Sequence, residues 1–77
     1  MKADAVQITE REATLEITYN TGEYSDSNRF SEVIGGRYDY SAHEAVRSVL
    51  ESARAWADGM RLEYPDISVW DATGNTY

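Results

Sequence analysis

His43 is the only histidine in this sequence, and therefore the one side chain whose ordinary pKa suits proton transfer near neutral pH. A catalytic role would also need a nucleophile or a second metal ligand at matched geometry. The zinc-binding pattern HExxH is absent, because the position four residues after His43 is Arg47. The chain contains no cysteine, which removes thiolate nucleophiles and thiolate ligands. We therefore expect His43 to be a surface or capping residue and the protein not to be an enzyme.

Other polar motifs indicate structure rather than chemistry. The stretch 71–75 resembles an acidic calcium loop, but its glycine is at the fourth position rather than the sixth and no bidentate glutamate follows. Gly35 and Gly36 lack the spaced glycines and the lysine of a phosphate-binding loop. Nothing in the pattern marks the paired carboxylates as buried: Glu10 with Glu12, and Asp39 with Glu44. We expect no metal and no cofactor.

The segment from Ser41 to about Tyr64 is the only one long and periodic enough to be a helix. Ser41 with Glu44 three residues later forms the signature of a capping box, and the helix is predicted to pass Gly59 and end near Glu63, before Pro65. Apolar residues recur along it at steps of three and four: Ala42, Ala45, Val46, Val49, Leu50, Ala53, Trp56, Ala57 and Met60. Two surface ion pairs are expected at four-residue spacing: Arg47 with Glu51, and Arg54 with Asp58.

Alternating apolar and polar residues predict strands on both sides of the helix. Residues 6–9 and 13–19 form a predicted hairpin around the polar turn 10–12, and residues 20–28 have the composition of a loop. Residues 67–70 form a short last strand, and the turn 71–75 lets Thr76 and Tyr77 fold back. In 30–40 the alternation changes phase at the two glycines, which fits either a second hairpin, with Val33 opposite Tyr38, or a bulge in one bent strand.

These elements predict one α+β domain covering residues 1–77. It is an antiparallel sheet of four or five strands with one long helix across one face, in the order β-β-β(-β)-α-β. The predicted core joins the helix residues Val46, Val49, Leu50, Ala53, Trp56 and Met60 to the strand residues Val6, Ile8, Leu15, Ile17, Val33, Ile67 and Val69.

Acidic side chains dominate the charge, with 14 Asp and Glu against 7 Lys and Arg and a net charge of −7. This balance argues against direct binding to nucleic acid or to an anionic membrane, and predicts a basic protein surface as the partner. Solvation alone, or adaptation to high salt, would give the same balance. No apolar run approaches the ~20 residues needed to cross a bilayer, and the start lacks a secretion signal, so a cytoplasmic location is expected.

The aromatic residues are too many for so small a core, and some are therefore expected to face a partner. We expect acids on the outer face of the sheet, at Glu12, Glu16, Glu32 and Asp39, and on the outer face of the helix, at Glu44, Glu51 and Asp58. The predicted partner-binding residues are Glu16, Tyr24, Glu32, Tyr38, Asp39, Tyr40 and Trp70. For each tyrosine the alternative is packing at the rim of the sheet with the hydroxyl in water.

The chain is small, acidic and free of cysteine, and its strand, helix, strand layout ends in residues 64–71. In these features it resembles small phage-encoded inhibitors of the anti-CRISPR type. The resemblance includes no diagnostic motif, and no functional residue can be carried over. It implies an inhibitor that occupies a basic surface of a CRISPR effector, in the cytoplasm of the host cell if the protein is phage-encoded. The alternatives are a small module that self-associates through a strand edge, so that the protein is a monomer or a homodimer, and a salt-adapted acidic domain without a basic partner.

Overall fold

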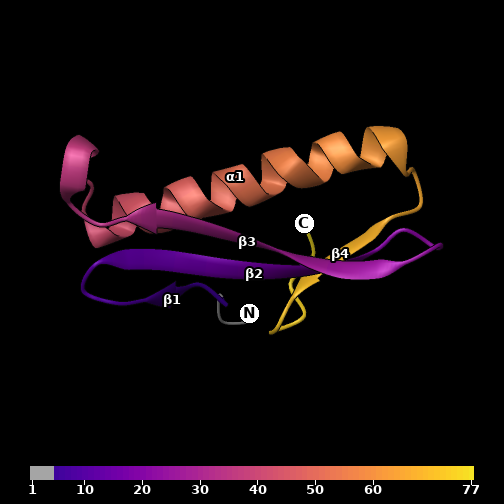
Figure 1. The fold of residues 1–77 in the computed structure, drawn as a ribbon, viewed down its shortest axis with the longest axis horizontal. Helices are drawn as coiled ribbons and strands as arrows, with labels where there is room; N and C mark the ends of the chain where they lie inside the picture. The colour runs from indigo at the N-terminus through magenta and orange to yellow at the C-terminus, as the bar shows by residue number, and fades with distance from the viewer. Residues whose placement is uncertain (1–4) are drawn as a thin grey trace.

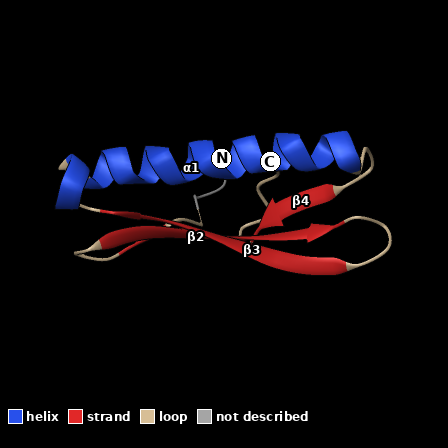
Figure 2. Ribbon diagram, turned by 45° about the horizontal axis from the view of Figure 1, so that its top comes forward, coloured by secondary structure: helices blue, strands red, loops and turns tan. Residues whose placement is uncertain are grey.

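The computed structural model describes residues 5–77, which form an antiparallel sheet with one long helix across one face (Figure 1; Figure 2). The elements are β1 (Gln7–Ile8), β2 (Glu12–Asn20), β3 (Ser25–Val33), α1 (Ala42–Glu63) and β4 (Ser68–Asp71). One 3₁₀ turn, η1 (Gly36–Tyr38), lies between β3 and α1. The predicted α+β class is confirmed, with four strands in the sheet.

β2 is the central strand of the sheet. It pairs with β3 along all nine of its residues. The other side of β2 is shared, because β1 pairs beside Ala13 and Thr14 whereas β4 pairs with the stretch from Ile17 to Asn20. β3 therefore forms one edge of the sheet alone, and two short strands divide the other.

The core lies between α1 and one face of β2. Alternate residues of β2 point toward the helix, and both Leu15 and Ile17 are 0% exposed. The buried residues of α1 are mostly alanines: Ala45, Val49, Ala53 and Ala57. Alanines leave little side-chain volume between helix and sheet, so Leu15 and Ile17 fill the space between them at close packing.

Some residues predicted for the core lie at its margin or outside it. Val46, Leu50, Trp56 and Ile67 are only partly buried against the core. Ile8 and Val33 are 55% and 54% exposed, so their assignment to the core was wrong. Ile8 ends a two-residue strand at the sheet edge. Val33 pairs with Glu12, on the face of the sheet that points away from α1.

α1 begins and ends where the sequence predicts. The Glu44 N–H donates to Ser41 Oγ at 3.2 Å and the Ser41 N–H donates to Glu44 Oε1 at 3.1 Å, which completes the capping box. These hydrogen bonds with Ser41 hold the pKa of the Glu44 carboxyl below its ordinary value. The helix passes through Gly59 and ends at Glu63, two residues before Pro65.

Ion pairing along α1 differs from the prediction. Asp58 pairs with Arg61, three residues later, at 2.8 Å, and neither predicted pair is formed among the described residues. The helix nonetheless repeats its charges every seven residues, with acids at Glu44, Glu51 and Asp58 and arginines at Arg47, Arg54 and Arg61. Its exposed side therefore alternates in sign along the axis.

The predicted loop at residues 20–28 is wrong in its second half, because β3 begins at Ser25. The polar residues there are compatible with an edge strand. The N–H groups of Ser27 and Arg29 donate to the side-chain oxygens of the preceding Asp26 and Asn28, at 2.8 and 2.9 Å. Pairing with β2 thus outweighs the turn preference of these side chains.

The chain reverses at the two glycines, but neither predicted form occurs. Gly35 and Gly36 have φ of 74° and 66°, and η1 then leads to Asp39 with φ 52°. The Gly35 N–H donates to the Tyr40 carbonyl at 2.7 Å, which closes a loop over residues 35–40. Val33 consequently does not lie opposite Tyr38, since that register requires a two-residue turn.

The C-terminal turn is built around the buried carboxylate of Asp71, which is 1% exposed. Asp71 Oδ1 accepts hydrogen bonds from the Thr73 N–H, the Thr73 hydroxyl and the Asn75 N–H, and Oδ2 accepts one from the Tyr77 hydroxyl at 2.5 Å. Burial alone would raise the pKa of Asp71, but these hydrogen bonds, that of Tyr77 first, lower it below the ordinary value. Residues 76 and 77 fold back along β4, as predicted, with Thr76 opposite Trp70.

Truncation of Leu15 tests the core. We expect Leu15→Ala to lower the free energy of unfolding by about 2–5 kcal/mol, because the cavity lies between closely packed helix and sheet. Leu62→Ala is the matched control, since Leu62 is 88% exposed, and should change stability by less than about 0.5 kcal/mol. Urea denaturation followed by circular dichroism measures both. Equal effects of the two substitutions would contradict this core.

Acid denaturation tests Asp71. Its lowered pKa means that the ionised carboxylate stabilises the fold above pH ~4 and that this stabilisation is lost as the pH falls through the folded-state pKa. Asp71→Asn should cost about 1–3 kcal/mol at pH 7. The difference from the unsubstituted protein should then shrink between pH 4 and the lowered pKa. Unfolding free energies measured from pH 7 down to 2.5 would refute this if the difference stayed constant.

Candidate functional site

The residues predicted to touch a partner do not form one surface. Tyr38, Asp39 and Tyr40 lie in loop 35–40 at the start of α1, and Tyr24 lies in the turn between β2 and β3 near the other end of the helix (Figure 1). Glu16 and Trp70 lie on the open face of the sheet, and Glu32 faces the helix. The structure thus divides the prediction among separate regions.

Glu32 was assigned to the outer face of the sheet, and this assignment was wrong. β3 pairs Glu32 with the buried Ala13, so its side chain points to the helix side. Glu32 Oε1 accepts a hydrogen bond from the Ser48 hydroxyl at 2.7 Å. Asp39 likewise lies outside the sheet, in loop 35–40. Glu32 therefore connects β3 to α1.

Loop 35–40 presents two stacked tyrosines. The rings of Tyr38 and Tyr40 are 5.6 Å apart at 27°, and Tyr38 is 66% exposed. The Arg37 guanidinium lies 5.8 Å from the Tyr38 ring centroid, a distance that permits a cation–π contact. A shallow hollow beside the loop is lined by Tyr40, Glu44, Arg47, Ser48 and Glu51. Arginines are mixed with the acids here, so this region is not uniformly acidic.

The open face of the sheet is also mixed in charge. Glu16 stands directly opposite Arg29 in the register of β2 and β3. Both line a shallow hollow with Ala5, Gln7, Thr14 and Ala72. Trp70 lies opposite Thr18 and is half-buried. Such a face carries both positive and negative side chains, so its charge does not favour a basic partner over an acidic one.

A second tyrosine group, the tyrosine cluster of Tyr19, Tyr24 and Tyr64, lies near the end of α1. Tyr24 packs edge to face on Tyr19 at 6.1 Å and on Tyr64 at 6.4 Å. Tyr19 continues the contacts inward to Trp56 at 5.1 Å, and Trp56 touches Phe30 at 5.7 Å. The exposed end of this chain of rings is therefore supported by the core.

Carboxylates surround the tyrosine cluster. Burial raises the pKa of Tyr19, and the nearby Tyr24 and Asp26 raise it further. Hydrogen bonding to Tyr24 raises the pKa of Tyr64, followed by the charges of Glu63, Tyr24 and Glu23. The tyrosine cluster thus brings the exposed ring of Tyr24 together with the carboxylates of Glu23, Asp26 and Glu63.

Local structure fixes the positions of these rings. Asn20 Oδ1 accepts the Gly22 N–H at 2.7 Å, and Gly22 has φ 95°, which shapes the tight turn before Tyr24. Tyr64 is the C-cap residue of α1, and its N–H donates to the Met60 carbonyl. Both rings therefore extend from well-defined backbone and are 6.4 Å apart.

The sequence identified only one member of this cluster. Tyr24 was predicted to bind a partner, whereas Tyr19 and Tyr64 were not among the predicted partner-binding residues. Tyr19 continues the alternation of β2 and Tyr64 follows Met60 by four residues, so each signal was present. The missing information was the pairing of Tyr19 with Asp26, which brings the turn to the helix end.

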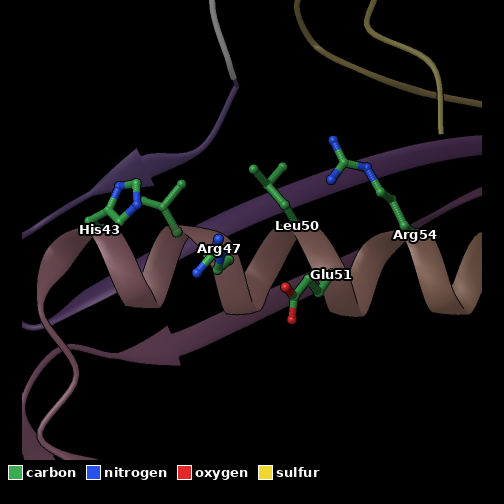
Figure 3. Close-up of a pocket in the computed structure, with 6 residues that line it drawn as sticks. His43, Arg47, Leu50, Glu51 and Arg54 are labelled. Carbon is green, nitrogen blue, oxygen red and sulfur yellow. The ribbon is translucent and has the colours of Figure 1, made fainter.

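A further shallow groove runs along α1, and its lining mixes charged and apolar residues. Figure 3 shows His43, Leu50 and Arg54 on the same side of the helix. The groove is lined by His43, Val46, Arg47, Leu50, Glu51 and Arg54. His43 is exposed, and the groove contains no serine or threonine that it could activate.

Residues 5–77 contain no cluster of three histidine or acidic side chains that could hold a metal ion. Among the same residues, no helix combines the length and the apolar character needed to cross a membrane. Comparison with models of protein families, with curated proteins and with solved structures finds no match to this chain. The candidate site therefore depends on its geometry alone.

Titration of the phenols tests the tyrosine cluster. Tyr24→Phe keeps the ring but removes the hydroxyl and its charge, so the raised pKa of Tyr64 should fall toward its ordinary value. The carbon-13 shifts of the tyrosine rings, followed by NMR against pH, measure it. Tyr38→Phe, in loop 35–40, is the control and should leave Tyr64 unchanged. An unaltered Tyr64 midpoint in Tyr24→Phe would show that the hydroxyls do not interact.

Proposed function

We propose that the protein is a non-enzymatic binding protein that occupies a basic surface of a nucleic-acid-binding complex through its tyrosine cluster. The observation that carries the proposal is the combination of Tyr24, 46% exposed, with Glu23, Asp26 and Glu63. Such a surface suits arginine or lysine side chains, which can pair with the carboxylates and lie on the ring faces.

Charge and aromatic packing contribute to binding at this surface in different ways. The net charge of −7 accelerates encounter with a positive surface and disfavours anionic partners. Charge alone gives little affinity once exposed pairs are screened by salt. A rigid aromatic anchor supplies the remaining affinity, because a tyrosine packed against its neighbours loses little conformational entropy on binding. Tyr24 meets that requirement through its contacts with Tyr19 and Tyr64.

The basic surface that the sequence resemblance implies belongs to a CRISPR effector, whose guide and target strands lie in positively charged channels. An acidic protein bound there would compete with nucleic acid for the same cations. The mode of action we propose is therefore steric and electrostatic exclusion, without chemistry on the nucleic acid. Loop 35–40 is the second contact that this proposal allows, because Tyr38 is the other strongly exposed tyrosine.

Binding kinetics with a purified CRISPR effector complex test the proposal. Charge reversal by Asp26→Lys together with Glu63→Lys should slow association and flatten its dependence on salt, since both residues lie at the tyrosine cluster. Tyr24→Ala should instead speed dissociation, by about 30-fold if Tyr24 is a hot spot worth 2 kcal/mol.

Matched controls separate the cluster from overall charge. Glu10→Lys together with Glu12→Lys changes the net charge equally at the β1–β2 turn and should reduce association less. Tyr38→Ala reports on loop 35–40. If the folded protein binds no basic complex at low salt, or binds one equally well after the reversals at Asp26 and Glu63, the acidic surface serves solvation and the proposed function is wrong.

A further inference from the structure

We infer that the protein forms a homodimer in which the β3 strands of two copies pair antiparallel about Ser31. This pairing joins the two sheets into one and places the two α1 helices side by side. The inference concerns a different surface from the tyrosine cluster, and it stands whether or not the proposed function is correct.

The outer edge of β3 is the longest unpaired edge in the described sheet. The Ile34 N–H donates to the Arg11 carbonyl at 2.7 Å, in register with the pairing of β3 and β2. Backbone groups alternate in direction along an antiparallel strand, so even-numbered residues of β3 face β2 and odd-numbered residues face outward. An exposed edge of this kind is a template for pairing with another chain.

Only the first half of that edge is blocked. The outward N–H groups of Ser27 and Arg29 already donate to Asp26 Oδ1 and Asn28 Oδ1. In the part of the chain that the structure describes, no acceptor is bonded to the outward N–H groups of Ser31 and Val33. Val33 is also 54% exposed. The second half of β3 therefore combines free donors with uncovered apolar surface.

Like charges limit the register of a symmetric pair. A dyad at Arg29 would set Arg29 opposite its own copy and Asp26 opposite Glu32, and a dyad at Glu32 would set two carboxylates face to face. A dyad at Phe30 would pair Ser31 with Arg29 and Val33 with Ser27, so that no pair along the edge would have both N–H groups free. A dyad at Ser31 places a free donor at the centre and brings Arg29 beside Val33 of the second copy.

The position of α1 fits such a pair. Trp56 contacts Tyr19 on β2 and Phe30 on β3, so the helix axis lies over these two strands. With strands about 4.8 Å apart, an axis midway between β2 and β3 lies about 5 Å from the dyad, which sets the two helices about 10 Å apart. Helices pack at 8–10 Å. The added strand pairing therefore sets the two helices at contact distance.

The side of α1 that turns toward the β3 edge carries small residues. The hydrogen bond from Ser48 to Glu32 of β3 shows which side of the helix this is. Ser52 and Gly59 lie on the same side and are exposed. Ala55, also exposed, flanks them. These residues let a second helix approach closely. The helices would run antiparallel, so their dipoles oppose favourably.

A second copy is the occupant that these features favour. Each open donor of one β3 meets an open carbonyl of the other, and Ser48 and Ser52 of each helix lie nearest the dyad, because Ser48 bonds Glu32 beside Ser31. Neither surface offers the acidic and aromatic contacts expected for a basic protein. In this register the start of β3 in each copy, next to Tyr24, lies toward the end of β3 in the other copy, where loop 35–40 begins.

Sedimentation equilibrium from about 1 µM to 1 mM tests the dimer. We expect a mass that rises toward twice the 8.7 kDa of one chain, more readily at 0.5 M than at 0.05 M salt, because two copies of charge −7 repel each other. Ser52→Glu should weaken association at least 10-fold. Gln7→Glu adds the same charge at the opposite edge of the sheet and should leave association unchanged. A monomer at 1 mM in 0.5 M salt, or a dimer that Ser52→Glu does not weaken, overturns the inference.

A cross-linking experiment tests the register. Paired residues at a hydrogen-bonded position lie with Cα atoms about 5.5 Å apart, which a disulfide can span. The chain has no cysteine of its own, so Ser31→Cys should form a covalent dimer on mild oxidation, and Ser27→Cys should not. Equal cross-linking of both variants, or of neither while the dimer persists, rejects pairing about Ser31. Binding of Ser52→Glu to a basic complex, measured separately, shows whether the proposed function survives independently.

Discussion

The structure depends on the close packing of an alanine-lined helix against β2. Ala45, Ala53 and Ala57 bring α1 near the sheet, and Leu15 and Ile17 fill the narrow space that remains. Such a core has no room for large rings at its centre. Trp56 and Phe30 pack at the side of this core. The contacts between exposed tyrosines and their neighbours lie near the two ends of the helix, between Tyr24 and Tyr64 at one end and between Tyr38 and Tyr40 at the other.

Periodicity, together with signals at the helix ends, predicted the elements that have one apolar face. α1 was defined by the capping box at Ser41, the apolar stripe and Pro65, and β2 by its strict alternation. The first half of β3 could not be found in this way, because its residues there include serine, aspartate and asparagine. Their strand conformation comes from pairing with β2 and from side-chain hydrogen bonds to the next N–H, and neither has a signal in hydropathy.

The candidate site was less predictable than the fold for a related reason. A binding surface combines residues from different elements, and their proximity depends on register. Tyr24 stood out because it was a large residue in a polar segment, but its neighbour Tyr64 lies forty positions later in the chain. Glu32 illustrates the opposite error: a one-residue phase in β3 decides whether a carboxylate faces water or bonds Ser48.

The distribution of charge separates two kinds of association in one small protein. Along α1, Glu44, Glu51 and Asp58 alternate with arginines at the same seven-residue spacing, so the helix contributes little to the net charge of −7. The excess of acid therefore lies mainly on the strands and loops, including the surroundings of the tyrosine cluster.

The two proposed contacts should respond differently to salt. A basic partner would be attracted to the tyrosine cluster, and salt would weaken that contact. Pairing along β3 involves backbone groups and small side chains, so salt would strengthen it by screening the repulsion between copies. Ionic strength would thus shift the balance between self-association and partner binding, because the two surfaces respond to it with opposite sign.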